Sequence, residues 1–300
     1  MRFGLQLRAE DPTTVADEAR QAEELGFDTV LVADHVGSDW SPLLSLAIAA
    51  GATTTIRLGT FVLNAGLHHP LMLARDVATL DQLSGGRVEL GLGAGHTPTE
   101  FAAAGVPLAP ARERKARLAE FVEIVRALLD GGTVDFHGDH FSLTAASIGR
   151  RTVQERLPIL VGGSGPALLD HAARHADIVG FTGLGRTLPD GHRHTARFQP
   201  DVLDDEVALV RQAAAERIVE LNVLVQVVDV TTDRRAAAAA IADRVDDLTV
   251  EAALATPFLA LGTHDEIAEQ LGVTEDRWGI SYFVVREAEA FAPVIDRIRP

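Results

Sequence analysis

The sequence predicts a (β/α)₈ barrel, and three observations support that prediction. Eight short apolar runs are spread along the 300 residues, and each is followed by a stretch of helical period. The first four runs begin at residues 2, 29, 56 and 87, and a spacing of about 27 to 31 residues is typical of a strand with its helix. Hairpin signals are few, so parallel strands joined by helices are favoured. A doubly wound open sheet is the alternative, but eight strands favour closure.

The first part of the chain contains four such units. Strands are expected at 2–7, 29–33, 56–63 and 87–93. Helices are expected at 12–25, 42–52 and 70–83, and each begins with proline, whose missing N–H costs nothing in the first helical turn. Gly26 follows the first helix, as expected at a helix end.

The second part repeats the alternation less regularly. Strands are expected at 158–163, 177–181, 219–230 and 279–285, and helices at 111–129, 166–175, 204–217, 234–247 and 265–271, with a last helix that ends near 298. Two insertion segments interrupt a single domain that spans 1–300. Segment 131–157 contains "TVDFHGDHFSL", which predicts a small hairpin, and segment 182–203 is polar, turn-rich and long, which predicts a lid-like loop.

Composition excludes several classes of protein. There is no cysteine, so disulfides, thiolate zinc sites and a cysteine nucleophile are excluded. A formal net charge of -16 repels phosphate backbones, and no nucleic-acid partner is expected. No run reaches the roughly 18 uncharged apolar residues of a membrane span, and Arg8, Glu10 and Asp11 interrupt the only early apolar run. We therefore expect a cytoplasmic protein without a membrane partner.

Polar residues and glycines follow the predicted strands, on the face where barrel enzymes place their reacting groups. They are Asp34 and His35, then Asn64, His68 and His69, then Gly93, Gly95 and His96, and finally Gly162, Gly163 and Ser164. The "GGSGP" loop before a helix suits a phosphate group, although a plain turn is the alternative. His35 could be an ordinary loop histidine, and His69 could simply flank the helix that starts at Pro70. Zinc is disfavoured, but four histidines keep it as an alternative.

The segment "ARERKAR" (111–117) places Arg112, Arg114, Lys115 and Arg117 in the first turns of a helix, where the helix dipole disfavours cations. Such a cluster could receive a polyanion. Local ion pairs with Glu113 and Glu120 are the alternative.

Four segments resemble the bacterial luciferase-like superfamily: "GFDTVLVADH" (26–35), "IRLGTFVLNA" (56–65), "TLDQLSGGRVELGLGAG" (79–95) and "PILVGGSGP" (158–166). More narrowly, they resemble the branch that uses the deazaflavin coenzyme F420, with FMN as the alternative cofactor. The similarity extends from Phe3 to Val285. It implies a barrel of the bacterial luciferase-like type and a homodimer.

The resemblance also implies roles for individual residues. A cis peptide bond is expected at Phe61–Val62, behind the flavin ring. Asp34 would bind the polar edge of the ring, and His35 would face the substrate over the reactive carbon. Asn64, Gly93, Gly95 and His96 would line the ring and ribityl chain, whereas Gly162, Gly163 and Ser164 would hold the phosphate. The loop in which relatives carry an acidic residue has His96 here, with Glu100 further on, so a second acid or base is not assigned.

The sequence thus favours an F420-dependent oxidoreductase that transfers a hydride between the deazaflavin and a small organic substrate, with His35 and Asp34 as catalytic residues. An imidazole, with an ordinary pKa near 6.5, suits His35 as proton donor or acceptor. The cofactor tail would bind Arg112 to Arg117, or Arg193 and Arg197. The alternatives are an FMN-dependent monooxygenase that works with a separate flavin reductase, a non-catalytic flavin-binding barrel and a metal-dependent hydrolase.

Overall fold

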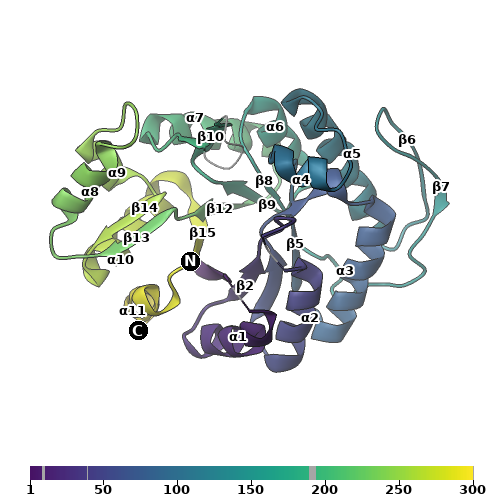
Figure 1. Ribbon diagram of the computed structural model, residues 1–300, viewed down its shortest axis with the longest axis horizontal. Helices are drawn as coiled ribbons and strands as arrows, with labels where there is room; N and C mark the ends of the chain where they lie inside the picture. Colours follow the sequence, from purple (N-terminus) through teal and green to yellow (C-terminus); the bar gives the residue numbers. More distant parts are fainter. Residues whose placement is uncertain (9–10, 39, 189–193, 300) are drawn as a thin grey trace.

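A closed barrel of parallel strands forms the centre of the computed structural model, which describes residues 1–8, 11–38, 40–188 and 194–299 (Figure 1). Eight strand positions in this described part make up the barrel: β1 (Arg2–Gln6), β2 (Thr29–Val32), β3 (Arg57–Thr60) continued by β4 (Leu63–Asn64), β5 (Val88–Gly93), β8 (Ile159–Gly162), β9 (Ile178–Phe181), β12 (Glu220–Leu224) and β15 (Ile280–Val285). β15 pairs with β1, and β3 pairs with β5, so the sheet has no open edge. The predicted (β/α)₈ barrel is confirmed.

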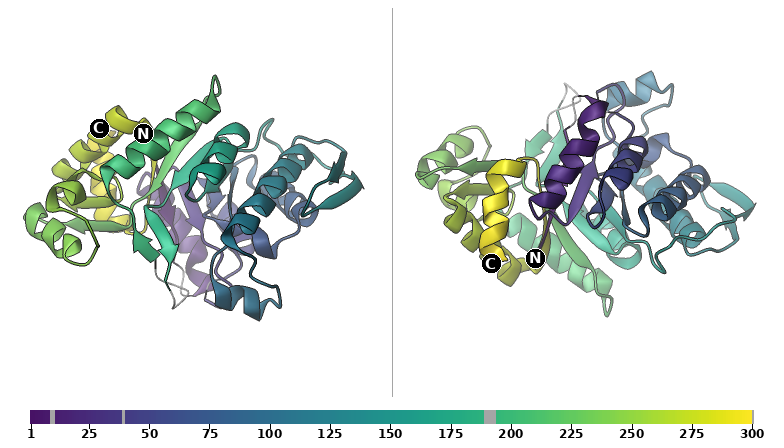
Figure 2. Two further views of the ribbon diagram at one scale, coloured as in Figure 1. Left: turned by 90° about the horizontal axis from the view of Figure 1, so that it is seen from above. Right: turned by 90° about the horizontal axis from the view of Figure 1, so that it is seen from below.

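Helices surround the barrel, as the views from above and below show (Figure 2). The longer ones are α1 (Val15–Glu24), α2 (Pro42–Ala52), α3 (Pro70–Ser84), α5 (Ala111–Leu129), α6 (Pro166–His175), α7 (Pro200–Ala214), α10 (His264–Trp278) and α11 (Ala288–Ile298). The predicted bounds of α2, α5 and α6 are confirmed. α7 begins at Pro200 rather than at 204, because proline is well suited to the first turn. No helix of the described ranges has the length and apolar character needed to cross a membrane.

Shorter elements lie between these units. They are the 3₁₀ turns η1 (Pro12–Thr14) and η2 (Ala65–Leu67), the helices α4 (Pro98–Ala103), α8 (Arg234–Ala242) and α9 (Val250–Ala255), and the paired strands β6 (Val134–His137) with β7 (Ser142–Ala146) and β10 (Leu184–Thr187) with β11 (His194–Ala196). β6 and β7 form the hairpin expected within 131–157. The segment predicted as a lid-like loop contains the β10–β11 ribbon, and its residues 189–193 lie outside the described ranges.

The expected continuous strand at 219–230 is wrong. It divides into β12, which stays in the barrel, and β13 (Val227–Val230), which leaves it and pairs with β14 (Leu259–Gly262) beside the barrel (Figure 1). Gln226 marks the division: its main-chain N–H donates to Phe258 O at 2.7 Å and its side chain donates to Thr182 O at 2.8 Å. β14 and α9 were not predicted, and the helix expected at 234–247 ends at Ala242.

The expected strand at 56–63 is also interrupted. β3 ends at Thr60, the peptide bond Phe61–Val62 is cis as the resemblance implied, and β4 begins at Leu63. Thr60 Oγ1 bridges the interruption, because it donates to Gly91 O at 2.8 Å and accepts from Gly91 N–H at 2.9 Å. β4 therefore continues alongside β5 and delivers Asn64 to the end of the barrel.

A buried ionic network occupies the end of the barrel where the strands begin. Arg2 binds Glu89 at 2.9 Å and Glu220 at 2.8 Å, and its guanidinium lies 3.5 Å from the centre of the Tyr282 ring. The Tyr282 hydroxyl donates to Glu89 Oε1 at 2.6 Å. Burial, together with the Glu89 carboxylate, raises the pKa of Tyr282, so the phenol stays neutral and acts as the donor.

Replacing Glu89 by Ala should lower the free energy of unfolding by about 3 kcal/mol, because Arg2 and the Tyr282 hydroxyl would lose their shared partner in a buried site. Urea unfolding followed by circular dichroism measures this change. Tyr282→Phe, which removes one hydrogen bond, should cost only about 1 kcal/mol. Equal losses for the two variants would contradict a central role of the carboxylate.

Candidate active site

Asp34 links the ends of two neighbouring strands. It follows β2, all four residues of which are buried, and its side chain is almost buried. Its Oδ2 atom accepts the main-chain N–H of Asn64 at 2.9 Å and lies 3.0 Å from His68 Nε2. This contact suits the tautomer of His68 that carries its proton on Nε2, with the carboxylate oxygen as acceptor. Asp34 thus holds the loop after β4 against the end of β2.

His35 and Glu100 form the second pair of this region. His35 Nδ1 lies 2.8 Å from Glu100 Oε1, and the imidazole is 45% exposed whereas the carboxylate is only 8% exposed. Glu100 belongs to the first turn of α4, which Pro98 begins. A buried carboxylate beneath a half-exposed imidazole orients the ring and favours the tautomer with its proton on Nδ1.

The insertion contributes a third contact. His194, in β11, places its Nε2 atom 3.0 Å from His96 Nε2, with the two ring centres 4.5 Å apart. The His96 ring in turn lies 6.3 Å from the His35 ring. Three imidazoles from distant parts of the chain therefore lie in a row at the mouth of the barrel.

Glycines make room for the chain between β3 and β4. A Cβ atom at Gly93 would lie 2.6 Å from Val62 Cγ2, and one at Gly91 would lie 2.0 Å from Thr60 O. Gly162 faces the same Val62 side chain, at 3.4 Å from Cγ1. Any side chain at Gly91 or Gly93 would displace this segment.

Gly95 packs directly against Asn64. It has a positive φ of 68°, and a Cβ atom there would lie 2.0 Å from Asn64 Oδ1. That oxygen accepts the N–H of Gly66 at 3.0 Å, whereas Asn64 Nδ2 is buried without a hydrogen-bond partner. A buried amide donor without a partner is costly, so a hydrogen-bond acceptor at this position would stabilise the mouth.

The "GGSGP" loop leads into α6. Gly163 N–H donates to Gly180 O at 3.3 Å, so this N–H is already used within the barrel. Gly165 is the N-cap of α6 and leaves the first turn without a side-chain cap. Lys115 Nζ donates to Ser164 O at 2.7 Å and brings a cation to the same place.

Cations of α5 mainly hold main-chain carbonyls at the mouth. Arg114 donates to Gly95 O at 2.9 Å, and Arg117 donates to Ala65 O. Burial, followed by the charges of Arg114 and Arg197, lowers the pKa of Lys115. The alternative of ion pairs with Glu113 and Glu120 is not seen among the described residues, and Glu120 instead accepts the main-chain N–H groups of 139–141 in the hairpin turn. Arg193 lies outside the described residues.

A cavity of about 390 Å³ adjoins His35. Its lining includes Gln6 and Arg8 from the end of β1, together with Ser38 and Trp40 from the loop after β2. Arg286 donates to Gln6 Oε1 at 3.0 Å, and burial, followed by the charge of Arg8, lowers the pKa of Arg286. Positive charge therefore gathers beside the cavity.

The sequence profile of the luciferase-like monooxygenase family matches residues 2–246 of this chain. The chain belongs to that family. The luciferase-like chain is also 33% identical to the F420-dependent glucose-6-phosphate dehydrogenase of Nakamurella multipartita, over 94% of this chain and 83% of the relative. It is 32% identical to the 5,10-methylenetetrahydromethanopterin reductase of Methanopyrus kandleri, over 58% of this chain and 53% of that relative.

The fold agrees with solved structures of the family. The coenzyme F420 dependent tetrahydromethanopterin reductase from Methanopyrus kandleri superposes with a TM-score of 0.78. The comparison covers 99% of each chain, at 21% sequence identity. This likeness supports the barrel of the luciferase-like type.

The structure brings Asp34, His35, Asn64, Gly95 and His96 of the luciferase-like chain to one mouth, as their places after strands predicted. Sequence reasoning missed His194, although its imidazole meets that of His96. It also left Glu100 without a role. The sequence signal for His194 was the pair of histidines in "HRH" (192–194). The signal for Glu100 was a carboxylate soon after His96.

Gly95→Ala should disturb Asn64, whereas Gly105→Ala is a matched control. Both glycines have a φ of 68°, so in both variants the alanine must adopt a left-handed backbone conformation, which costs about 1–2 kcal/mol. Only at Gly95 would the new Cβ meet another side chain, since nothing lies within 4 Å of that position at Gly105. Thermal unfolding should show the larger loss for Gly95→Ala, and equal losses would contradict the contact with Asn64.

Proposed function

We propose that this luciferase-like protein is an F420-dependent oxidoreductase that transfers a hydride between the deazaflavin and a small organic substrate. The observation that carries the proposal is the His35–Glu100 pair at the mouth, with Nδ1 and Oε1 2.8 Å apart. The named relatives that depend on F420 support the choice of cofactor. When bound, the deazaflavin would supply the hydride chemistry, and the protein residues would handle the proton.

Residues of the mouth suit a ring with a phosphate-bearing chain. Asn64 Nδ2 is a buried donor without a partner, Gly95 packs against the same side chain, and Asp34 accepts the Asn64 main-chain N–H. Phe61 and Val62 would form the wall behind the ring, and Gly93 and Gly162 leave space for Val62. The phosphate would lie against Ser164 at the uncapped start of α6, next to Lys115, while the Gly163 N–H stays bound to Gly180 O.

His35 would exchange the proton with the substrate through Nε2. Nδ1 is engaged by Glu100, and no hydrogen bond to Nε2 is present in the described part of the chain. When Nε2 takes a proton from a substrate alcohol, the ring becomes an imidazolium, and the buried Glu100 carboxylate stabilises it. In the opposite direction the same nitrogen would deliver the proton.

The β10–β11 ribbon and the cavity beside His35 suggest how the substrate is held. Because His194 of β11 reaches His96, we place the 182–203 insertion over the substrate. Arg8 in the cavity wall and Arg286 beside it favour a substrate with an anionic group. One named relative is a glucose-6-phosphate dehydrogenase, so glucose 6-phosphate and unphosphorylated glucose are the first pair of substrates to compare. Equal activity on both sugars would argue against an anion site.

The alternative is an FMN-dependent monooxygenase, which the description of the family profile favours. Spectroscopic titration of the protein with F420 and with FMN separates the two functions. We expect saturable binding of F420 and hydride transfer without an added flavin reductase. Tight binding of FMN alone, with oxygen-dependent turnover, would support the alternative instead.

His35→Ala should lower kcat by roughly 10²- to 10⁴-fold, which is the usual contribution of a general acid or base. Affinity for F420, measured by the same titration, should change little. Glu100→Gln should give a smaller loss, because the ring would keep its proton acceptor but lose the stabilising charge. His137→Ala, a hairpin histidine that contacts Ser142, is the control. Unchanged turnover of His35→Ala would refute the assignment.

We also propose that the protein is cytoplasmic and a homodimer. Leu44 and Ile48 on α2 and Met72 on the neighbouring α3 are 69%, 47% and 46% exposed, which gives these helices an apolar outer face. Leu44→Glu should convert the dimer to monomers in light scattering after gel filtration, because it places a charge in an apolar interface. Ile218→Glu, at a 98% exposed position, is the control. A monomeric wild-type protein would contradict the proposal.

A further inference from the structure

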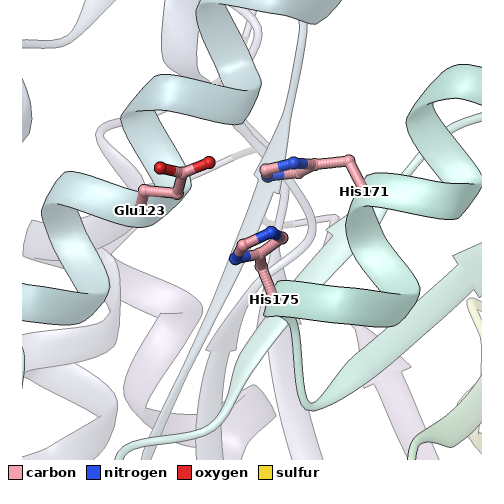
Figure 3. A group of neighbouring side chains, drawn as sticks. All are labelled: Glu123, His171 and His175. Atoms are coloured by element: carbon pink, nitrogen blue, oxygen red, sulfur yellow. The ribbon is translucent and has the colours of Figure 1, made fainter. Parts of the chain in front are cut away.

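A group of metal-binding side chains lies between α5 and α6, away from the mouth of the barrel. Glu123 comes from α5, and His171 and His175 come from the last turns of α6 (Figure 3). One potential ligand atom from each of the three residues lies within 4.8 Å of the other two. It is the one such group within the described residues, and it does not include any histidine of the mouth.

The two histidines are arranged as a pair. They are four residues apart on one helix, so both project from the same face. Their rings are stacked, with centres 4.3 Å apart and planes at 17°. The carboxylate of Glu123 points toward the two rings from the opposite helix (Figure 3).

A hydrogen bond with the main chain of Ala119 engages one nitrogen of the His171 ring. His171 Nε2 is buried without a hydrogen-bond partner. No hydrogen bond or ion pair joins Glu123 to either ring, although the three ligand atoms converge. Since one ring nitrogen of His171 is engaged by the Ala119 main chain, the unpartnered Nε2 is the nitrogen that can bind a cation.

We propose that Glu123, His171 and His175 bind a divalent transition-metal ion, for which Zn²⁺ is the best match. Two imidazoles and one carboxylate are ligands that zinc accepts, whereas magnesium and calcium prefer oxygen ligands alone. With metal–ligand bonds of about 2.0–2.2 Å, ligand atoms in a tetrahedral site lie roughly 3.3–3.5 Å apart. The ligand atoms of this group lie within 4.8 Å of one another, so they would need to approach by up to about 1.5 Å, and water would complete the coordination.

A metal at this position would join α5 to α6. The same two helices are already connected near the mouth, where Lys115 donates to Ser164 O in the loop before α6. Glu123 lies eight residues beyond Lys115, which corresponds to about 12 Å along the helix. The ion would therefore be structural and would fix the spacing of the two helices at the end of α6 opposite to the "GGSGP" loop.

Isothermal titration of the chelator-treated full chain with ZnCl₂ tests the proposal. We expect one saturable site per chain and a rise of a few degrees in the thermal midpoint with zinc. Glu123→Gln and His175→Ala should each weaken zinc binding by about tenfold or more. Glu123 is exposed, so its substitution should leave folding intact, which circular dichroism checks. His264→Ala, at the start of α10, is the matched control and should bind zinc like the wild type.

Three results would overturn the site: no saturable binding of zinc, unchanged affinity in both Glu123→Gln and His175→Ala, or loss of binding only when His96 is replaced. The last result would assign the zinc to the mouth histidines. Because the readouts are heat and thermal stability of the protein without cofactor, the test does not depend on the proposed oxidoreductase activity.

Discussion

The close approach of the β3–β4 connection to β5 determines the geometry of the mouth. Thr60, Phe61 and Val62 can occupy the barrel interior because Gly91 and Gly93 present no side chains to them. β4 then continues along β5, and Asn64 emerges where its main-chain N–H meets Asp34. A side chain at either glycine would push the connection outward, and the contacts of Asp34, Asn64 and Gly95 would be lost together.

A second constraint comes from α5. Its first turns carry Arg114, Lys115 and Arg117, although a helix dipole favours anions there. Each cation donates to a carbonyl at a different loop: Gly95 O, Ser164 O and Ala65 O. The cost of placing cations at a helix start is offset because they hold three mouth loops in place. This helix thus connects the parts that would surround the ring and the phosphate.

The two ends of the barrel use charge differently. Where the strands begin, Arg2, Glu89 and Tyr282 bind one another in a largely buried network. Where the strands end, His35 is half exposed and Asn64 Nδ2 lacks a partner. Stability and chemistry are therefore separated along the barrel axis, as is usual for this fold.

The sequence by itself determined the barrel, the bounds of α2, α5 and α6, and the placement of Asp34, His35, Asn64 and His96 at one rim. These features follow from local periodicity, proline and glycine positions, and the rule that parallel strands end on one face. Only the tertiary structure decided that Glu100 supports His35, that His194 meets His96, and that the seventh strand divides at Gln226. Those features depend on contacts between residues far apart in the chain, and no local pattern specifies which distant side chain or carbonyl will be the partner.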